Sequence, residues 1–487
     1  MLTCIAIFLP TILGFFIIAA ILRNDTETSW GERIGFSFPL GAGILTLQMF
    51  LLGILRVPLT LCNTTAPIAV ELIGLAIWIC WKKIPLIPIT SKPESGLFAE
   101  FSASQNHRIK KCVLAILLLW IVAKLCSVFL LTGLRPIYSW DAWAEWTAGA
   151  KVFYNTHSLM LDAPVQDFFG KSAVHRIIFY PLHNPLLQVW ISLWNKTFDD
   201  VLVKFCNPIY LLSLVICFYY IILRETNRVL ALTLIVIFLS SPLMSYHAIE
   251  LNCDLMLGVY FFLASVSFLK AIRGNVAYWI LTGIYSTEAL FIKEQAFLFI
   301  LPLILSAIVY LRFDIKRGPR KFHILSLFIP FLAIVPWYIF VYYYGLGFET
   351  YYHDYAYPLM TSIFGEDSNR ISKYLSFHPE ILTGYFYWFF SLNNFNVIIF
   401  FSPLLLLAYG KLTKESLYLL FPIICYMLSY IFIYMFTIFF SWFLWGVIFF
   451  RNTLTFYPSI CLLIVLLLKK YTLIPSPQHR SVLERKL

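Results

Sequence analysis

Two acidic residues, Asp141 and Glu145, stand four positions apart among three tryptophans, directly after a long apolar run. Side chains at positions i and i+4 share one face of a helix, so both carboxylates could point into one cavity. A carboxylate beside a bilayer is energetically costly, so it is expected there only where water solvates it or where it has a function. One interpretation is a general base with a substrate-binding acid in a cavity of a helical bundle. The alternative is a solvated helix with ordinary surface acids.

A second polar segment, residues 180–187, reads Tyr-Pro-Leu-His-Asn-Pro-Leu-Leu and contains Tyr180 and His183. Its two prolines favour an extended entry into a helix. His183 could donate a hydrogen bond to a phosphate or orient a carboxylate. Asn184 and Pro185 are equally consistent with the cap and first turn of a helix, an interpretation that leaves His183 unexplained.

Asp254 lies at the end of a third polar segment, residues 247–254, which separates two apolar runs. An aspartate at this position could cap the following helix. It could also be a second acid that converges on the cavity holding Asp141. The sequence favours neither interpretation over the other.

Three further charged residues, Lys293, Glu294 and Arg451, lie within or between strongly apolar runs. At bilayer depth each charged side chain costs about 2.5–3.5 kcal/mol, so such residues must face protein or water. Lys293 could hold a lipid-linked phosphate, although a simple turn between helices would also explain it. The guanidinium of Arg451 suits phosphate, with snorkelling to the interface as the alternative.

The composition identifies the class of protein that must position these residues. The chain has 487 residues, of which 60% are hydrophobic and only 13% are charged, whereas soluble domains carry about 25% charge. Its net charge of +11 comes from short basic clusters between apolar runs, as expected for a polytopic membrane protein and not for one that binds nucleic acid. The ten cysteines have no CxxC spacing, so we expect no disulfide framework and no cysteine metal site.

Apolar runs of about 20 residues predict an all-α fold with about thirteen transmembrane helices. The predicted spans are residues 4–22, 34–55, 65–81, 112–132, 203–223, 229–246, 254–271, 277–292, 295–311, 323–344, 386–408, 417–439 and 445–468. With thirteen spans, all the basic clusters fall on one side, which the positive-inside rule makes cytoplasmic. The long loops 133–202 and 345–385 then lie outside, the first with short interfacial helices. Trp140, Trp143 and Trp146 recur every three residues there and predict one helical face at the membrane surface. We divide the chain into three N-terminal helices (1–81), a cytoplasmic linker (82–111), a transmembrane module (112–468) and a cytoplasmic tail (469–487).

The order of these motifs resembles that of the GT-C superfamily of polytopic glycosyltransferases. The closest resemblance is to the branch with the protein O-mannosyltransferases and the lipid A aminoarabinose transferase. The elements that carry it are an acidic motif in the first long outer loop, a Tyr-Pro element before a helix, an Asp opening a later helix, a Lys-Glu pair, and an Arg before a late proline: Asp141 with Glu145, residues 180–186, Asp254, Lys293-Glu294, and Arg451 with Pro458. The chain departs from the family pattern in its His183-Asn-Pro element, in its spaced acids, and in the three helices that precede the acidic loop.

The resemblance implies an enzyme that moves a sugar from a polyprenyl-phosphate donor to a glycan, lipid or protein acceptor on the outer side of a membrane, by default the bacterial inner membrane. Asp141 would be the general base of an inverting transfer, and Lys293 and Arg451 would hold the leaving phosphate. The remaining expected donor-binding or substrate-binding residues are Glu145, Tyr180, His183, Asp254 and Glu294. The residues show no metal-ligand spacing, so no cofactor is required, although a divalent ion remains compatible with the resemblance. The competing class is a lipid or polysaccharide flippase, which the absence of an evident inverted repeat disfavours.

Overall fold

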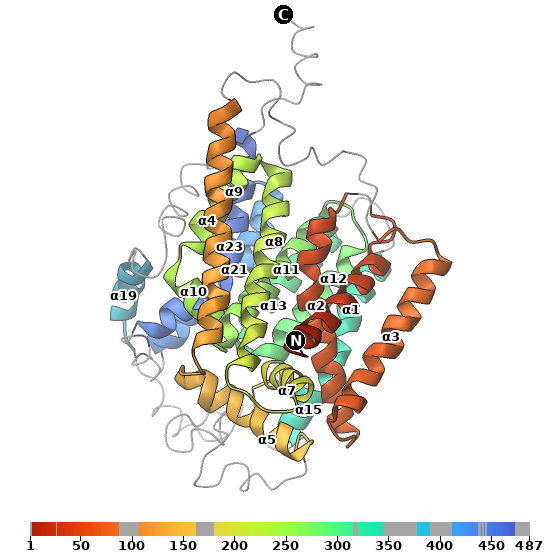
Figure 1. Ribbon diagram of the computed structural model, residues 1–487. Coiled ribbons are helices and arrows are strands. Elements are labelled where there is room, and N and C mark those ends of the chain that lie inside the picture. Colours follow the sequence, from red (N-terminus) through yellow and green to blue (C-terminus); the bar gives the residue numbers. More distant parts are fainter. Residues whose placement is uncertain are drawn as a thin grey trace, which may run out of the picture.

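The computed structural model describes residues 2–25, 27–86, 107–161, 180–314, 320–343, 377–389, 412–436, 440, 443 and 446–472. Every regular element within these ranges is a helix. The predicted all-α, polytopic membrane fold is confirmed by the long apolar helices that make up most of the described chain. Figure 1 shows them as a bundle of roughly parallel rods, with short helices gathered at one end.

Within the described residues, nine helices are long and apolar enough to cross a membrane. A helix needs about 20 apolar residues to do so. Seven of them correspond to α1 (Leu2–Ile21), α2 (Trp30–Ile54), α3 (Leu61–Trp81), α4 (His107–Leu134), α11 (Cys253–Ile272), α21 (Lys414–Phe436) and α23 (Val447–Thr472). The other two join α8 (Cys206–Glu225) to the preceding η3 (Leu202–Phe205), and α13 (Phe297–Val309) to η4 (Glu294–Ala296) and η5 (Tyr310–Asp314).

Two more candidate spans are bent pairs of helices. The first joins α9 (Arg228–Leu239) to α10 (Pro242–Ile249) at an angle of 70°. Ser241 caps α10 through the amide of Met244, and Pro242 occupies the first turn, where its missing N–H costs nothing. The second, bent by 47°, comprises α14 (Arg320–Phe328), η6 (Ile329–Ala333) and α15 (Val335–Tyr343).

Two of the thirteen predicted spans differ from these candidates. The span predicted at 277–292 is α12 (Tyr278–Ile292), a helix of only 15 residues, too short to cross alone. The span predicted at 386–408 lies mostly outside the described residues, as do most of the predicted loop 345–385, the tail beyond residue 472 and most of the linker. Only α19 (Glu380–Phe389) is described at the start of that predicted span.

Short helices follow α4 at the lower end of the bundle in Figure 1: the π-helical turn η2 (Ala142–Thr147), α5 (Ala148–Thr156) and α7 (His183–Asn195). Trp140 and Trp143 stack on each other and are exposed, but Trp146 is buried against Tyr180. The predicted surface of three tryptophans is therefore wrong for Trp146. A π turn makes i→i+5 hydrogen bonds, so residues three apart do not share a side of it.

The most buried long helices are α11 and α23, whose spans have 94% of their residues inside the protein. By contrast, α3 and α4 are only 17% buried and lie at the edge of the bundle, where their apolar side chains can face lipid. The first two N-terminal helices, α1 and α2, pack closely on each other. A Cβ atom on Gly14 of α1 would overlap the Ser37 carbonyl of α2, so only glycine permits this close approach of the two helices.

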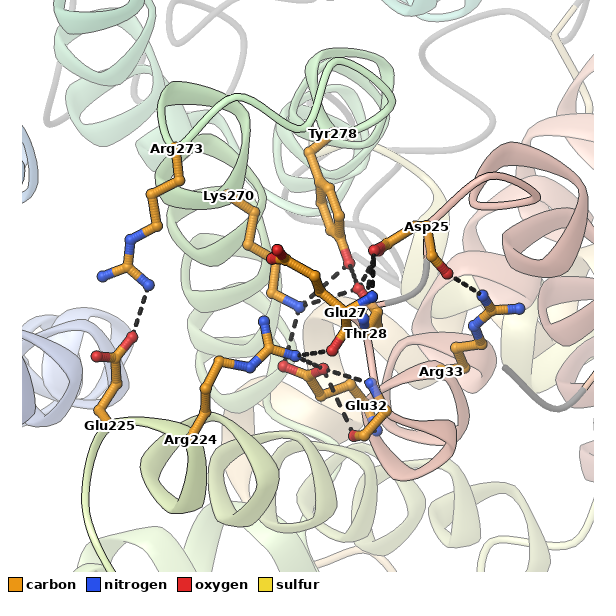
Figure 2. A network of polar contacts seen from close by, with 11 residues as sticks. Asp25, Glu27, Thr28, Glu32, Arg33, Arg224, Glu225, Lys270, Arg273 and Tyr278 are labelled. Carbon is orange, nitrogen blue, oxygen red and sulfur yellow. Dashed lines mark hydrogen bonds and ion pairs between the residues drawn. The ribbon is translucent and has the colours of Figure 1, made fainter. Parts of the chain in front are cut away.

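A network of ion pairs joins helix ends where α11 ends, and Figure 2 shows it from close by. Its centre is Glu32, which is fully buried at the start of α2. Lys270 of α11 donates to Glu32 over 2.9 Å, and Arg224 of α8 does so over 2.6 Å. At the edge of the network, Arg273 pairs with Glu225 and with Glu415 of α21. The basic ends of α8, α11 and α21 therefore lie on one side of the bundle.

We expect the substitution Glu32→Gln to destabilise the protein by about 3–5 kcal/mol, because it leaves two cations without their carboxylate in a buried setting. Glu415→Gln is the matched control, since it removes a partly exposed partner of Arg273 and should cost about 1 kcal/mol or less. Thermal unfolding of both variants in lipid nanodiscs measures the difference. Equal shifts in the two variants would contradict a central role for Glu32.

Candidate active site

Four charged side chains from distant parts of the chain form one continuous ion-pair chain. The guanidinium of Arg451 pairs with Asp141 through Nη1 and donates to Asp254 Oδ2 through Nε over 2.8 Å. Lys293 Nζ donates to Asp254 Oδ1 over 3.1 Å. The resulting order is Asp141, Arg451, Asp254, Lys293. The structure thus brings together four of the residues that the sequence singled out.

Each member of this chain sits at the end of a helix or beside a break. Asp141 immediately precedes the π turn η2, and Asp254 occupies the first turn of α11, where the helix dipole favours an anion. Lys293 has an extended backbone between α12 and η4, so that its side chain leaves the helical path and reaches α11. Arg451 lies near the start of α23. The site therefore depends on the relative placement of α11, α12 and α23.

Two aromatic side chains extend the cluster. His247 of α10 places Nδ1 3.6 Å from Asp254 Oδ2. The Tyr180 ring lies 5.9 Å from Lys293 Nζ, which is a cation–π contact. The same ring stacks on Trp146 of η2. Tyr180 is one of the site residues expected from the sequence, whereas His247 is not. The signal for His247 is its position seven residues before Asp254, on the same short polar segment.

Glu145 lies in the π turn, electrostatically coupled to the four ion-paired residues. Burial and the negative charge of Asp141 raise the pKa of Glu145 to about 8, although Lys293 and Arg451 act in the opposite direction. Glu145 therefore carries a proton at neutral pH and can donate a hydrogen bond. With this carboxyl group neutral, two carboxylates balance two cations in the cluster.

The structure places His183 elsewhere. Its ring is fully buried, with Nδ1 2.8 Å from the Thr46 hydroxyl and Nε2 2.8 Å from the Tyr210 hydroxyl. Burial lowers the pKa of His183 to about 3, so the ring is neutral. The nearest carboxylate is Glu288 of α12, at 3.7 Å. His183 thus fastens α7 to α2 and α8 and is not part of the ion-pair chain. Glu294 follows Lys293 directly and begins η4, but it is not one of the four ion-paired residues.

Helix capping does not explain Asn184 in the first turn of α7 or Asp254 in the first turn of α11. Helix α7 is preceded by Leu182 at its N-cap, and Asn184 donates instead to the carbonyl of Leu251 over 2.9 Å. The interpretation of Asn184 as a cap is wrong. Asn252 holds the N-cap position of α11, so Asp254 is free of that role and available to Arg451 and Lys293. No group of three or more His, Cys, Asp or Glu residues in the described chain is arranged to hold a metal ion.

Comparison with known proteins gives one match. Residues 181–343 match the model of the dolichyl-phosphate-mannose-protein mannosyltransferase family. The match covers about a third of the chain, including His183, Asp254, Lys293 and Glu294, and ends before Arg451. No curated protein and no solved structure matches the chain. The family match confirms the predicted resemblance and supports a membrane glycosyltransferase of the GT-C type.

The proton on Glu145 can be observed directly. We expect the infrared C=O stretch of a protonated carboxyl group to be present below pH 8 and lost above it, because the Glu145 pKa of about 8 exceeds the ordinary value. The difference between wild type and Glu145→Gln isolates this band. Glu380→Gln, at an exposed glutamate, is the control and should leave the band near pH 8 intact. A Glu145 band that titrates near pH 4 would contradict the assignment.

Proposed function

We propose that this protein transfers a sugar from a polyprenyl-phosphate donor to a hydroxyl group of a glycan, lipid or protein acceptor, with inversion at the anomeric carbon. The observation that carries the proposal is the ion-pair chain of Asp141, Arg451, Asp254 and Lys293 in a chain of GT-C type. It combines a carboxylate that can accept a proton with two cations that can receive a phosphate. A transfer from a sugar phosphate requires both.

Arg451 and Lys293 are the proposed phosphate-binding residues. A guanidinium group offers a planar fork of N–H donors that matches phosphate oxygens, and an ammonium group adds a point charge. Both cations share Asp254, which is almost fully buried and so keeps them close together. The donor phosphate is a diester with one negative charge, and its departure as a monoester adds a second. Cations placed beside it stabilise that developing charge.

Asp141 is the proposed base. The acceptor oxygen attacks the anomeric carbon on the face opposite the phosphate, its proton passes to Asp141, and the bond from the sugar to the phosphate oxygen breaks. Proton uptake removes the negative charge that Arg451 neutralises in the resting site. The guanidinium can then direct its charge to the leaving phosphate. Glu145, which holds its own proton, can donate a hydrogen bond to a sugar or acceptor hydroxyl without competing for the acceptor's proton.

The proposed orientation places this site on the extracytoplasmic side. The basic ends of α8, α11 and α21 lie at the opposite end of the bundle, where Arg224, Lys270, Arg273 and Lys414 are found. The positive-inside rule makes that end cytoplasmic. A lipid-linked donor exposed in the outer leaflet would then reach the cluster from the membrane. The bacterial inner membrane is the proposed location.

The first test is sugar transfer by the purified protein in lipid, with a panel of labelled polyprenyl-phosphate sugars and candidate acceptors. We expect turnover with one donor, and a fall of about 100-fold or more in Asp141→Asn, because the amide cannot take the proton. Asp200→Asn is the control, since Asp200 only makes an exposed ion pair with Lys151. Full transfer by a folded Asp141→Asn variant would remove Asp141 as the base. Lipid translocation without turnover would instead support a flippase.

A second test addresses the phosphate. Lysine cannot reproduce the two-pronged contact of Arg451 with Asp141 and Asp254, so Arg451→Lys should bind the donor about 10-fold or more weakly, given about 1.5–3 kcal/mol for a hydrogen bond to a charged group. Arg312→Lys, in the η5 turn that follows α13, is the matched control. Donor affinity is measured by isothermal titration in nanodiscs. Equal affinity in wild type and Arg451→Lys would remove Arg451 from the phosphate role.

A further inference from the structure

Glu250 is a fully buried carboxylate that the proposed chemistry does not use. It begins the connection 250–252, which joins α10 to α11. Its Oε2 atom accepts from the backbone amides of Tyr138 and Ser139, each at 3.5 Å. Both amides belong to residues 136–139, which have no regular structure and lead from α4 to Asp141. Amides in such a segment need partners outside it.

Two more contacts fix the same segment. The Ser139 hydroxyl donates to Asn252 Oδ1 over 3.0 Å. Lys204 Nζ donates to the Pro136 carbonyl over 3.4 Å, and lies 3.8 Å from Glu250 Oε1. Both charged groups of this pair are fully buried. Residues 136–139 are thus held at their start by Lys204, in the middle by Glu250 and at their end by Asn252.

The connection that provides these contacts is itself anchored to two helices. Asn207 of α8 donates its side-chain amide to the carbonyls of His247, Glu250 and Asn252. Asn184 of α7 donates to the remaining carbonyl, that of Leu251. Every backbone carbonyl of residues 250–252 therefore has a side-chain donor. The connection is a rigid support and not an adaptable loop.

We propose that Glu250 is a positioning residue, which sets the distance between Asp141 and Asp254 by holding the chain ahead of Asp141 against the start of α11. Asp141 follows Ser139 by two residues, and Asp254 follows Asn252 by two residues. The Ser139–Asn252 contact and the Glu250 contacts therefore set the separation of the two carboxylates that Arg451 bridges. We call the contacts of Glu250 and Asn252 with residues 136–139 the clamp. Its effect on catalysis rests on the proposed sugar transfer, whereas the clamp itself does not.

A simpler role for Glu250 would be to neutralise Lys204, and the experiment must separate the two. In a Lys204→Met background the buried cation is gone. Glu250→Gln then keeps an oxygen that can accept from the Tyr138 and Ser139 amides, whereas Glu250→Met has a similar length and accepts no hydrogen bond. Neither double variant carries a charge at position 204 or 250, and they differ in whether a side-chain amide with its acceptor oxygen faces the two backbone amides. A role in charge neutralisation alone predicts that they behave alike.

Hydrogen–deuterium exchange of residues 136–146 reports the clamp without any sugar donor. We expect exchange in the Glu250→Met double variant to be about 10-fold faster than in the Glu250→Gln double variant, because local opening exposes amides that have lost their acceptor. The Glu250→Gln double variant loses only the contact of Lys204 with the Pro136 carbonyl and should lie between wild type and the Glu250→Met double variant. Equal exchange in the two variants would overturn the proposal, whatever the protein's activity.

Transfer kinetics add the second readout. A displaced base lowers the rate of the chemical step, and a misplacement of about 1 Å can cost 100-fold. We expect kcat to fall about 10- to 100-fold in the Glu250→Met double variant and to be restored in the Glu250→Gln double variant, with the donor KM within about 2-fold throughout. An equal kcat in both variants would remove Glu250 from positioning. If the wild type itself transfers no sugar, the proposed sugar transfer is contradicted. The hydrogen–deuterium exchange result would still test the clamp.

Discussion

The bridge that Arg451 makes between Asp141 and Asp254 is the interaction on which the rest of the site depends. Charged groups within a membrane bundle are tolerated only with partners, and the four charges of this cluster come from four distant parts of the chain. Asp254 and Lys293 lie within a predominantly apolar region. Removing one of the four charges would leave another without compensation. The requirement for mutual neutralisation therefore fixes how α11, α12, α23 and the segment after α4 meet.

Helix α11 connects this bridge to the second network at the other end of the bundle. It carries Asp254 in its first turn and Lys270 in its last, sixteen residues and about 24 Å apart. Lys270 is bound to Glu32 of α2, and α2 in turn contacts His183 of α7 through Thr46. One of the two most buried long helices is thus tied at both ends by ion pairs. A scaffold held in this way can keep separate side chains within hydrogen-bond distance at the site.

Much of the site was predictable because charges are rare in this sequence. Asp141, Asp254, Lys293 and Arg451 were selected as exceptions to an apolar pattern, and the structure brings them together. His183 was selected for the same reason, but the sequence does not show on which side of α7 the ring lies. Glu250 passed unnoticed, since its function depends on amides more than a hundred residues away.

Predictions that depended on helical phase were less reliable than those that depended on composition. The apolar runs gave the fold class and most of the span positions. The tryptophan surface failed at Trp146, because the π turn at η2 changes which residues share a side. In such a turn the residues that line up are four to five apart, so Asp141 and Glu145 retain a common side. A π turn contains one residue more per hydrogen-bonded turn than an α-helix, and the regular spacing of the tryptophans in the sequence does not reveal it.

The two bridged carboxylates are not equivalent, and the difference supports separate roles for them. Asp254 is 1% exposed and binds both Arg451 and Lys293, whereas the Asp141 side chain is 23% exposed and pairs only with Arg451 among these cations. Protonating Asp254 would release two buried cations at once, which is costly. Protonating Asp141 releases one guanidinium toward the accessible side of the cluster. Asp141 is therefore the more exposed carboxylate and the one bound to a single cation, as the proposed base requires.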